Sequence, residues 1–425
     1  MRREISSLVQ YSRMAHLEAK KNTSLWVDTT PTTSYPPLEP GRHFDVAVLG
    51  GGIAGLTTAY LLERQGASVA VVEAGRIAAG VTAYTTAKVS SLHGTIYSTI
   101  ARKHGAGAAR TYATANQTAR EWMRARVDEH GIECDWRAKP AFTYAEDESD
   151  VAKVEQEVEA ATAAGLPASY TEETDLPWPV AAAVRVEDQA EFHPRLYLLA
   201  LAEQLTTIYE QTRATAVSAG TPNRIETTRG ELTADHVVVA THFPFLDRAG
   251  FFARMHPERS YALGLYLKRS AKPPQGMYLS TESPSHTVRS HPTANGELVI
   301  AGGESHKVGQ ADEAERVQRL EAWAHARFDV REIAYRWSTQ DNMPVDSLPY
   351  IGRMLPFQRG IWVATGFLKW GLTNGTAAGL ILADLIAGRD NPWASVFDAT
   401  RIKPIASASE FVKENANVAG HFVGD

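Results

Sequence analysis

Three glycines follow an apolar run near the start of the sequence, at a spacing that can hold phosphate groups. The run covers 44–49, and the glycines fit G-x-G-x-x-G: they are Gly50, Gly52 and Gly55. In this pattern the first glycine allows a tight turn, the second lets the backbone approach a pyrophosphate, and the third lets a helix pack closely on a strand. The spacing therefore predicts a dinucleotide site, with the phosphates at a helix N-terminus.

An acidic residue stands where such a site would hold a ribose. Glu73 ends a second apolar run, 68–73, about 20 residues after the first glycine. A carboxylate there accepts hydrogen bonds from an unphosphorylated adenosine ribose, so the sequence favours FAD or NAD over NADP. The alternative is a flexible Gly-Gly-Gly turn. The preceding apolar strand and the helical spacing of Ile53, Leu56 and Tyr60 count against that alternative.

A second strand–glycine–helix unit lies near the C-terminal end. The apolar run 360–366 ends in Gly366, and Gly371-Leu-Thr precedes a helix expected over 376–387 and closed by Gly388. In a flavoprotein such a helix N-terminus faces the pyrimidine side of the isoalloxazine and stabilises negative charge there. The pair of units therefore favours FAD over NAD. The alternative is a packing helix rich in small residues.

Length and composition are those of a soluble globular protein. The 425 residues are 44% hydrophobic and 22% charged, and the net charge is −6, which disfavours nucleic acid and anionic membranes as partners. No apolar run is long enough to cross a bilayer, and the first residues lack the apolar core of a signal peptide. The one cysteine, Cys134, permits no intrachain disulfide, and no spacing indicates a metal site. We expect a cytoplasmic protein without a metal.

The expected elements predict an α/β fold: a Rossmann-like FAD/NAD(P)-binding domain with a second, mostly antiparallel β-sheet domain for the substrate. Helices are expected at 107–130, 148–164, from Pro194 onward and at 312–328. Strands are expected at 133–136, 141–144, 183–186, 234–241, 259–268, 277–280, 286–290 and 297–301. The binding domain is expected to comprise 43–95, 181–245 and 336–400. The substrate domain would comprise 96–180 and 246–335, with a lead-in at 1–42 and a tail at 401–425.

The order of these motifs resembles the D-amino-acid oxidase/glycine oxidase superfamily of FAD-dependent oxidoreductases, over about 24–400. The strings that carry the resemblance are the glycine turn, Glu73-Ala-Gly-Arg76, Val237-Val-Val-Ala-Thr241, Asp346-Ser-Leu-Pro-Tyr-Ile-Gly352 and Ala364-Thr-Gly-Phe367 with Gly371-Leu-Thr373. Further strings look like a bacterial subfamily that often carries a C-terminal Rieske domain: they are 85–97, 189–194, 337–341 and 366–371. The sequence ends at Asp425 without a C-x-H…C-x-x-H pair, so we expect no built-in iron–sulfur cluster.

The resemblance implies which residues hold the cofactor, taken to be non-covalently bound FAD. Phosphate, ribose and flavin contacts would come from the two glycine units, from the segment 85–88 and from two other strand ends. The residues are Gly50, Gly52, Ile53, Ala54, Gly55, Glu73, Ala74, Arg76, Thr85, Thr86, Ala87, Lys88, Ala214, Ala240, Thr241, Gly366, Gly371, Leu372 and Thr373.

Four residues are candidates for the catalytic site. In amino-acid oxidases an arginine clamps the substrate carboxylate in a bidentate fork, and Arg289 is the candidate here; the alternative is a surface arginine. His306 would assist oxygen or a proton transfer, or else belong to a solvated loop. Trp370 would wall the site or pack behind it, and Lys369 stands beside it in the glycine loop.

The leading hypothesis is an enzyme that oxidises a C–N bond of a small amine or amino acid by hydride transfer to flavin N5. Its partners would be a small-molecule substrate and either dioxygen or an electron-acceptor protein. An alternative is an FAD dehydrogenase that passes electrons to a Rieske-type or other acceptor protein. A third reading is a non-catalytic flavin-binding module. The sequence names no substrate.

Overall fold

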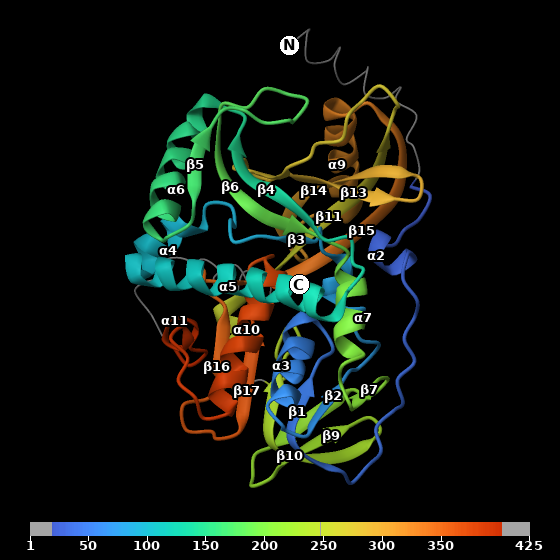
Figure 1. Ribbon diagram of the computed structural model, residues 1–425, viewed down its shortest axis with the longest axis vertical. Coiled ribbons are helices and arrows are strands. Elements are labelled where there is room, and N and C mark those ends of the chain that lie inside the picture. The colour runs from blue at the N-terminus through green and yellow to red at the C-terminus, as the bar shows by residue number, and fades with distance from the viewer. Residues whose placement is uncertain (1–18, 247, 402–425) are drawn as a thin grey trace.

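The computed structural model describes residues 19–246 and 248–401, and every structural statement here concerns those residues. Two sheets form the frame, one in the lower and one in the upper half of the molecule (Figure 1). The eight-stranded sheet has the order β16-β17-β10-β1-β2-β7, with β9 beside β10 and β8 beside β9. Its strands are β1 (His43–Leu49), β2 (Val69–Val72), β7 (Ile208–Tyr209), β8 (Ala214–Ser218), β9 (Asn223–Thr227), β10 (Gly230–Val239), β16 (Tyr350–Arg353) and β17 (Ile361–Thr365).

The nine-stranded sheet has the order β15-β11-β14-β13-β12-β4-β6-β3, with β5 beside β6. All its pairings are antiparallel except that of β12 with β4. Its strands are β3 (Lys88–Val89), β4 (Arg137–Ala145), β5 (Ala168–Thr171), β6 (Ala182–Glu191), β11 (Met255–Leu267), β12 (Met277–Ser280), β13 (Thr287–Thr293), β14 (Gly296–Lys307) and β15 (Val330–Pro344).

Helices cover both sheets, and α5 crosses between the two halves (Figure 1). The α-helices are α2 (Leu25–Asp28), α3 (Ile53–Arg64), α4 (Ile96–His104), α5 (Ala106–His130), α6 (Val151–Ala163), α7 (Pro194–Ala202), α8 (Phe251–Arg254), α9 (Glu313–Arg327), α10 (Gly371–Ile386) and α11 (Ala394–Phe397). Short 3₁₀ turns are η1 (Val81–Tyr84) and η2 (Glu148–Asp150). None of the described helices is both long and apolar enough to span a membrane.

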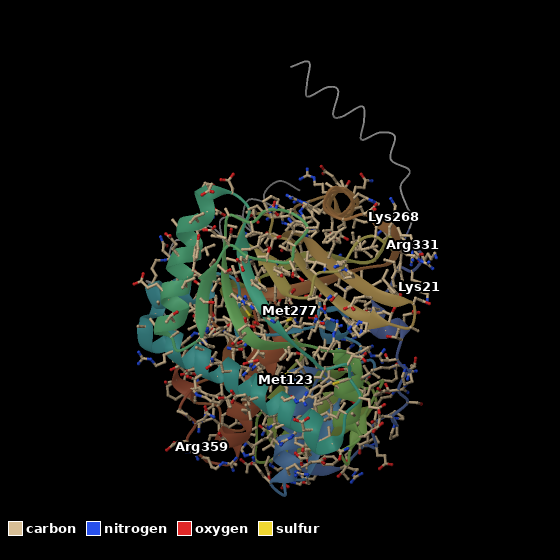
Figure 2. All side chains as sticks on the ribbon, turned by 45° about the horizontal axis from the view of Figure 1, so that its top comes forward. Lys21, Met123, Lys268, Met277, Arg331 and Arg359 are labelled. Carbon is tan, nitrogen blue, oxygen red and sulfur yellow. The ribbon has the colours of Figure 1, made fainter. Side chains whose placement is uncertain are left out.

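The central strands of the eight-stranded sheet are buried on both faces, as expected for a parallel sheet. On β1, Val46 and Val48 join the core under α3 and α10, while Ala47 and Leu49 join the core on the opposite face. The first of these cores also reaches the nine-stranded sheet through Met277, so one apolar core spans both halves. Figure 2 labels Met277 inside the molecule and Lys268 at its edge.

Helices α3 and α10 pack closely because α10 carries glycines where they meet. A Cβ atom added at Gly379 would lie 2.5 Å from Thr57 Cγ2, and one at Gly375 would lie 2.8 Å from Ile53 Cγ2. The two helices can therefore start side by side. This matters for function because both of their N-termini open toward the space between the sheets.

Most expected elements are present, with shifted ends. The expected helix at 107–130 is α5, which ends at Gly131 in the left-handed conformation, and the helix at Pro194 is α7. The strand expected at 133–136 is absent: β4 begins at Arg137, and Asp135 has φ +51°, which an extended strand does not adopt. The helix expected to start at residue 376 instead starts at Gly371.

The strand pairing departs from the expected domain boundaries at several places. The strand at 183–186 was expected in the dinucleotide domain, but β6 pairs with β4 in the nine-stranded sheet. Residues 336–344 also lie in that sheet, as part of β15. Conversely, Phe251 of α8 packs on Tyr350 beside the eight-stranded sheet. Apolar strands fit either sheet, so the sequence pattern alone did not reveal their pairing partners.

Candidate functional site

A cavity of about 520 Å³ lies between the two sheets, a size typical of cofactor and ligand sites. Residues from both glycine units and from the nine-stranded sheet line it. Sixteen of the predicted site residues are among them: Gly50, Gly52, Ile53, Ala54, Glu73, Ala74, Thr85, Thr86, Lys88, Ala214, Ala240, Thr241, Lys369, Trp370, Gly371 and Leu372. Seven others do not line it: Gly55, Arg76, Ala87, Arg289, His306, Gly366 and Thr373.

The glycine turn at one end of the cavity leaves no room for side chains. Gly50 has φ +114°, and an added Cβ would lie 2.4 Å from the carbonyl oxygen of Ala240. A Cβ at Gly55 would lie 1.9 Å from the carbonyl oxygen of Gly50. Gly55 thus shapes the turn from behind without facing the cavity. No described side chain caps α3, so its first N–H groups are free to bind an anion in the cavity.

Glu73 lies where the second strand of the turn unit ends. Its Oε2 accepts from the N–H of Gly51 at 2.8 Å and its Oε1 from the N–H of Gly75 at 2.7 Å. Each oxygen keeps a further lone pair for a ribose hydroxyl. Arg76 was expected to share this role, but its guanidinium turns to the buried Glu210, 3.7 Å away.

The segment 83–87 is held by four side chains that bind its carbonyl groups. Ser24 Oγ donates to the carbonyl of Ala83 at 2.5 Å, and Trp26 Nε1 donates to that of Thr85 at 2.7 Å. Trp337 Nε1 donates to the carbonyl of Tyr84 at 2.9 Å, and Arg289 Nη1 to that of Ala87 at 2.5 Å. These donors come from α2, β13 and β15, so distant parts of the chain fix the strip that lines the cavity.

Arg289 cannot clamp a carboxylate in this cavity, contrary to the sequence-based expectation. It is fully buried, and its other nitrogens donate to the carbonyl of Ser290 at 3.1 Å and contact His291 at 2.9 Å. Glu191 lies 3.4 Å from it. Burial lowers the pKa of Arg289 to about 10, and the guanidinium remains charged. It shares a strand face with Thr287, which lines the cavity, but Ala87 and α2 cover it.

The N-terminus of α10 lies beside that of α3 and opens into the same cavity. Its backbone at Gly371 and Leu372 lines the cavity, and no described side chain caps it. Thr373 turns away and donates to the carbonyl of Ser90 at 3.1 Å. Gly366 packs instead on Pro344, where an added Cβ would lie 2.6 Å from Cγ. The helix therefore presents backbone N–H groups to the cavity.

Trp370 walls the cavity and is supported from behind by His93. The two rings stack with centroids 4.3 Å apart and planes 15° apart. Both ring nitrogens of His93 have partners: Nε2 lies 2.6 Å from the carbonyl oxygen of Ser90, and Nδ1 lies 2.7 Å from the hydroxyl of Tyr112. Burial lowers the pKa of His93 to about 3, so the ring is neutral near pH 7.

Lys369 is held by an ion pair at the cavity wall. Its Nζ lies 2.9 Å from Glu258 Oε2 and also donates to Ser305. Burial would raise the pKa of Glu258, but His256 and Lys369 hold it well below its ordinary value. The Lys369 cation is therefore largely neutralised by a carboxylate of its own protein.

Lys88 and His306 differ in their access to the cavity. Lys88 lines it, contacts the carbonyl of Tyr278 at 3.4 Å and donates to Thr287 Oγ1. Burial, with a smaller effect of the nearby Arg289 cation, lowers the pKa of Lys88 to about 7. His306 follows Ser305, which lines the cavity, and so faces the other side of β14, where it lies 3.0 Å from the hydroxyl of Tyr261. His306 does not itself line the cavity, although Tyr261 does, and the expected role of His306 stays a prediction.

The sequence reasoning missed the polar wall on β15. Trp337, Thr339 and Asp341 are every second residue of the strand, so they share one face, and all three line the cavity. The buried hydroxyl of Thr339 has no hydrogen-bond partner among the described residues. The alternation of these residues is visible in the sequence, but the family resemblance that 337–341 carries implies no role for them.

The donor set fits a flavin dinucleotide. Two uncapped helix N-termini that start side by side supply N–H groups, Glu73 supplies acceptors beside the glycine turn, and a fixed backbone strip lines the wall. The long cavity is open to both sheets, so a bound ring system could meet a second ligand held by β15.

Comparison with known proteins gives a consistent result. The family described as FAD dependent oxidoreductase (DAO) matches residues 45–385. The putative Rieske 2Fe-2S iron-sulfur protein YhfW of Bacillus subtilis is 36% identical over 416 residues, which cover 96% of this chain and 81% of that protein. The γ-glutamylputrescine oxidoreductase of Escherichia coli is 23% identical, covering 81% of this chain and 84% of that protein.

Among solved structures, the glycine oxidase of Geobacillus kaustophilus has the same fold. Its TM-score is 0.71 at 19% identity, and the match covers 85% of this chain and all of that one. The family match spans both glycine units and the whole nine-stranded sheet. This chain belongs to the DAO family of FAD-dependent oxidoreductases.

Proposed function

We propose that this protein oxidises a C–N bond of a small amine or amino acid, giving an imine that water hydrolyses. The observation that carries the proposal is a single cavity that joins two uncapped helix N-termini to the polar face of β15. Bound FAD supplies the acceptor, at N5, for the hydride that leaves the substrate carbon. The amine nitrogen of the substrate provides the electron pair that forms the C=N bond as the hydride departs.

We infer that FAD lies along the cavity, with its pyrophosphate at α3 and its pyrimidine at α10. The N–H groups of Gly52, Ile53 and Ala54 would bind the phosphates, and Glu73 the ribose. The N-terminus of α10 would stabilise negative charge that develops on the pyrimidine. The strip at Thr85 and Thr86 would contact the ring system. Because the four donors described above fix this strip, it needs little reorganisation during the reaction.

The visible absorption spectrum of the purified protein tests the proposal. We expect flavin bands that bleach under anaerobic conditions when a small amine or amino acid is added, and that return with oxygen or an artificial acceptor. A protein that binds no FAD would contradict the cofactor assignment. Flavin bands that no member of a broad panel bleaches would contradict the reaction, and would favour a non-catalytic flavin-binding module.

A second candidate is a dehydrogenase that passes electrons to a protein acceptor rather than to dioxygen. The relative that is 36% identical carries a Rieske iron–sulfur name, which supports an iron–sulfur acceptor. Oxygen consumption measured with substrate, with and without an artificial one-electron acceptor, separates the candidates. Turnover that requires the acceptor favours the dehydrogenase, and equal turnover without it favours an oxidase.

We infer a cytoplasmic location, supported by the single cysteine, which requires no oxidising compartment. Fractionation of the source cells, with flavin absorbance or an antibody as the marker, tests this inference. Recovery in a membrane or secreted fraction would contradict it.

A further inference from the structure

One carboxylate in the cavity wall has no partner. Asp341 lines the cavity from β15, in register with Glu258 of β11. Among the described residues it accepts no hydrogen bond, and it interacts with Lys369 and Glu258 only through their charges. Two residues earlier on the same face, the buried hydroxyl of Thr339 also lacks a partner. A free carboxylate and a free hydroxyl thus share one patch of the wall.

The cations of the cavity are already occupied or lie elsewhere. Lys369 is paired with Glu258 at 2.9 Å. Lys88 is bound to Thr287. Arg213 lies next to Ala214, beside the loop that carries Glu73, and so belongs to the adenosine end. Arg289 is covered by Ala87 and α2.

The wall near Asp341 is therefore unsuited to a carboxylate ligand. Bidentate recognition of a carboxylate needs a guanidinium that faces the ligand, and none of the guanidinium groups in 19–246 and 248–401 faces this end of the cavity. An unpaired carboxylate in a partly enclosed wall instead favours a cation, because a cation offsets the hydration that the carboxylate loses when a ligand covers it. Phe367 lines the same cavity, and an aromatic face also attracts ammonium groups.

We propose that Asp341 is the counter-ion for an ammonium group of the ligand, with the hydroxyl of Thr339 beside it. The cavity would then bind amines as ammonium ions with no carboxylate on the reacting carbon, rather than α-amino acids, and the nitrogen would pass one proton to the Asp341 carboxylate before the hydride leaves. This proposal rests on the proposed function in one respect: it takes the ligand that carries the ammonium group to be the substrate. The preference for a cation does not itself depend on turnover.

A pair of probes of similar shape and opposite charge tests the proposal. Phenyltrimethylammonium and benzoate are added separately to the FAD-bound protein, and the change in the flavin absorption bands gives each Kd. We expect the cation to bind at least about tenfold more tightly than benzoate, and Asp341→Asn to remove that preference. Tighter binding of benzoate to the unaltered protein would overturn the proposal. So would an unchanged preference in Asp341→Asn that retains FAD.

A matched variant removes a carboxylate that lies outside the cavity. Asp329 is half-exposed, precedes the same strand and pairs with Lys268 at 2.6 Å. Asp329→Asn should leave both dissociation constants unchanged. If Asp341→Asn fails to retain FAD, Thr339→Val provides the second test: it should weaken the cation relative to benzoate, and an unchanged ratio would count against the patch.

The outcomes separate this proposal from the proposed function. A cation preference that Asp341→Asn abolishes, in a protein that no amine reduces, would contradict only the proposed reaction. Flavin bleaching by α-amino acids, with tighter binding of benzoate than of the cation, would contradict only the role of Asp341.

Discussion

The two ends of the cavity are built from different parts of the polypeptide. At the eight-stranded sheet, the groups available for binding are mainly backbone N–H groups. The glycines at 50–55 and the uncapped N-termini of α3 and α10 present them. At the nine-stranded sheet, the groups available for binding are side chains, namely those of Thr339, Asp341 and the Lys369–Glu258 ion pair. A backbone site can be kept while side chains vary, so the first end suits a constant cofactor. The second end suits a ligand that particular side chains must recognise.

Arg289 lies on a strand of the nine-stranded sheet, but it holds the backbone at Ala87 and binds no ligand in the cavity. Its replacement therefore gives the largest expected effect. Arg289→Met would leave Glu191 with one buried partner fewer and free the carbonyl of Ala87. We expect the free energy of unfolding to fall by about 3–5 kcal/mol, measured by denaturant titration, and FAD to bind more weakly. The fraction that retains FAD should keep its preference for phenyltrimethylammonium over benzoate.

The exposed Arg269 serves as the control, since Arg269→Met removes the same guanidinium from the surface. If Arg289→Met instead keeps full stability and FAD affinity but loses binding of carboxylate ligands, Arg289 is the clamp that its sequence context suggested. The contrast between the two ends would then be wrong.

The next largest effect tests the glycine turn. Gly55→Ala places a Cβ 1.9 Å from the carbonyl oxygen of Gly50, so α3 must move away from β1. We expect a loss of about 1–3 kcal/mol in the free energy of unfolding and a protein purified with little FAD, read from the ratio of flavin to protein absorbance. Gly107→Ala is the matched control, because no atom lies within 4 Å of its added Cβ. Equal flavin content in the two variants would refute the close-packed turn.

A smaller effect concerns pH at the side-chain end. Loss of hydration raises the pKa of Asp341 to about 6 and lowers the pKa of Lys88 to about 7, so as the pH falls Asp341 becomes neutral and Lys88 becomes positive. Both changes disfavour a bound cation. The other charged groups at this wall are Lys369 and Glu258, with His256 3.4 Å from Glu258. Affinity for phenyltrimethylammonium should fall at least about tenfold between about pH 8 and about pH 5.

In Asp341→Asn the part of this fall that is centred near pH 6 should disappear. A flat profile in the unaltered protein would show that neither group meets the ligand. The profile is measured on the oxidised, FAD-bound protein, so it does not depend on turnover.

The same contrast explains what the sequence could predict. The turn at 50–55 and Glu73 were identified because backbone constraints require particular residue types at set spacings. The sequence predicts helix α10, but with a start later than the observed Gly371. Trp370 is an unusual N-cap, and Lys369 before it has φ +68°, so the usual signals of a helix start are missing. The wall at Thr339 and Asp341 was missed because β15 reaches the cavity through sheet pairing, which one sequence does not reveal.

Arg289 shows the limit most clearly. Its residue type suits a carboxylate clamp, and its strand was placed correctly. Its actual partners are Ala87, Ser290 and His291, and the contact with Ala87 depends on two segments about 200 residues apart that meet only in the folded protein. Residue type predicted what the group can bind, while burial determined what it does bind.

The most direct test of the account is a crystal structure of the FAD-bound protein. The account predicts pyrophosphate oxygens within about 3.2 Å of the backbone N–H groups at Gly52 and Ile53, and the pyrimidine edge of the flavin at the N–H groups of Gly371 and Leu372. It also predicts that the face of β15 with Asp341 lies across the remaining space from the ring. A flavin with its pyrimidine edge away from α10, or an FAD bound outside this cavity, would contradict it.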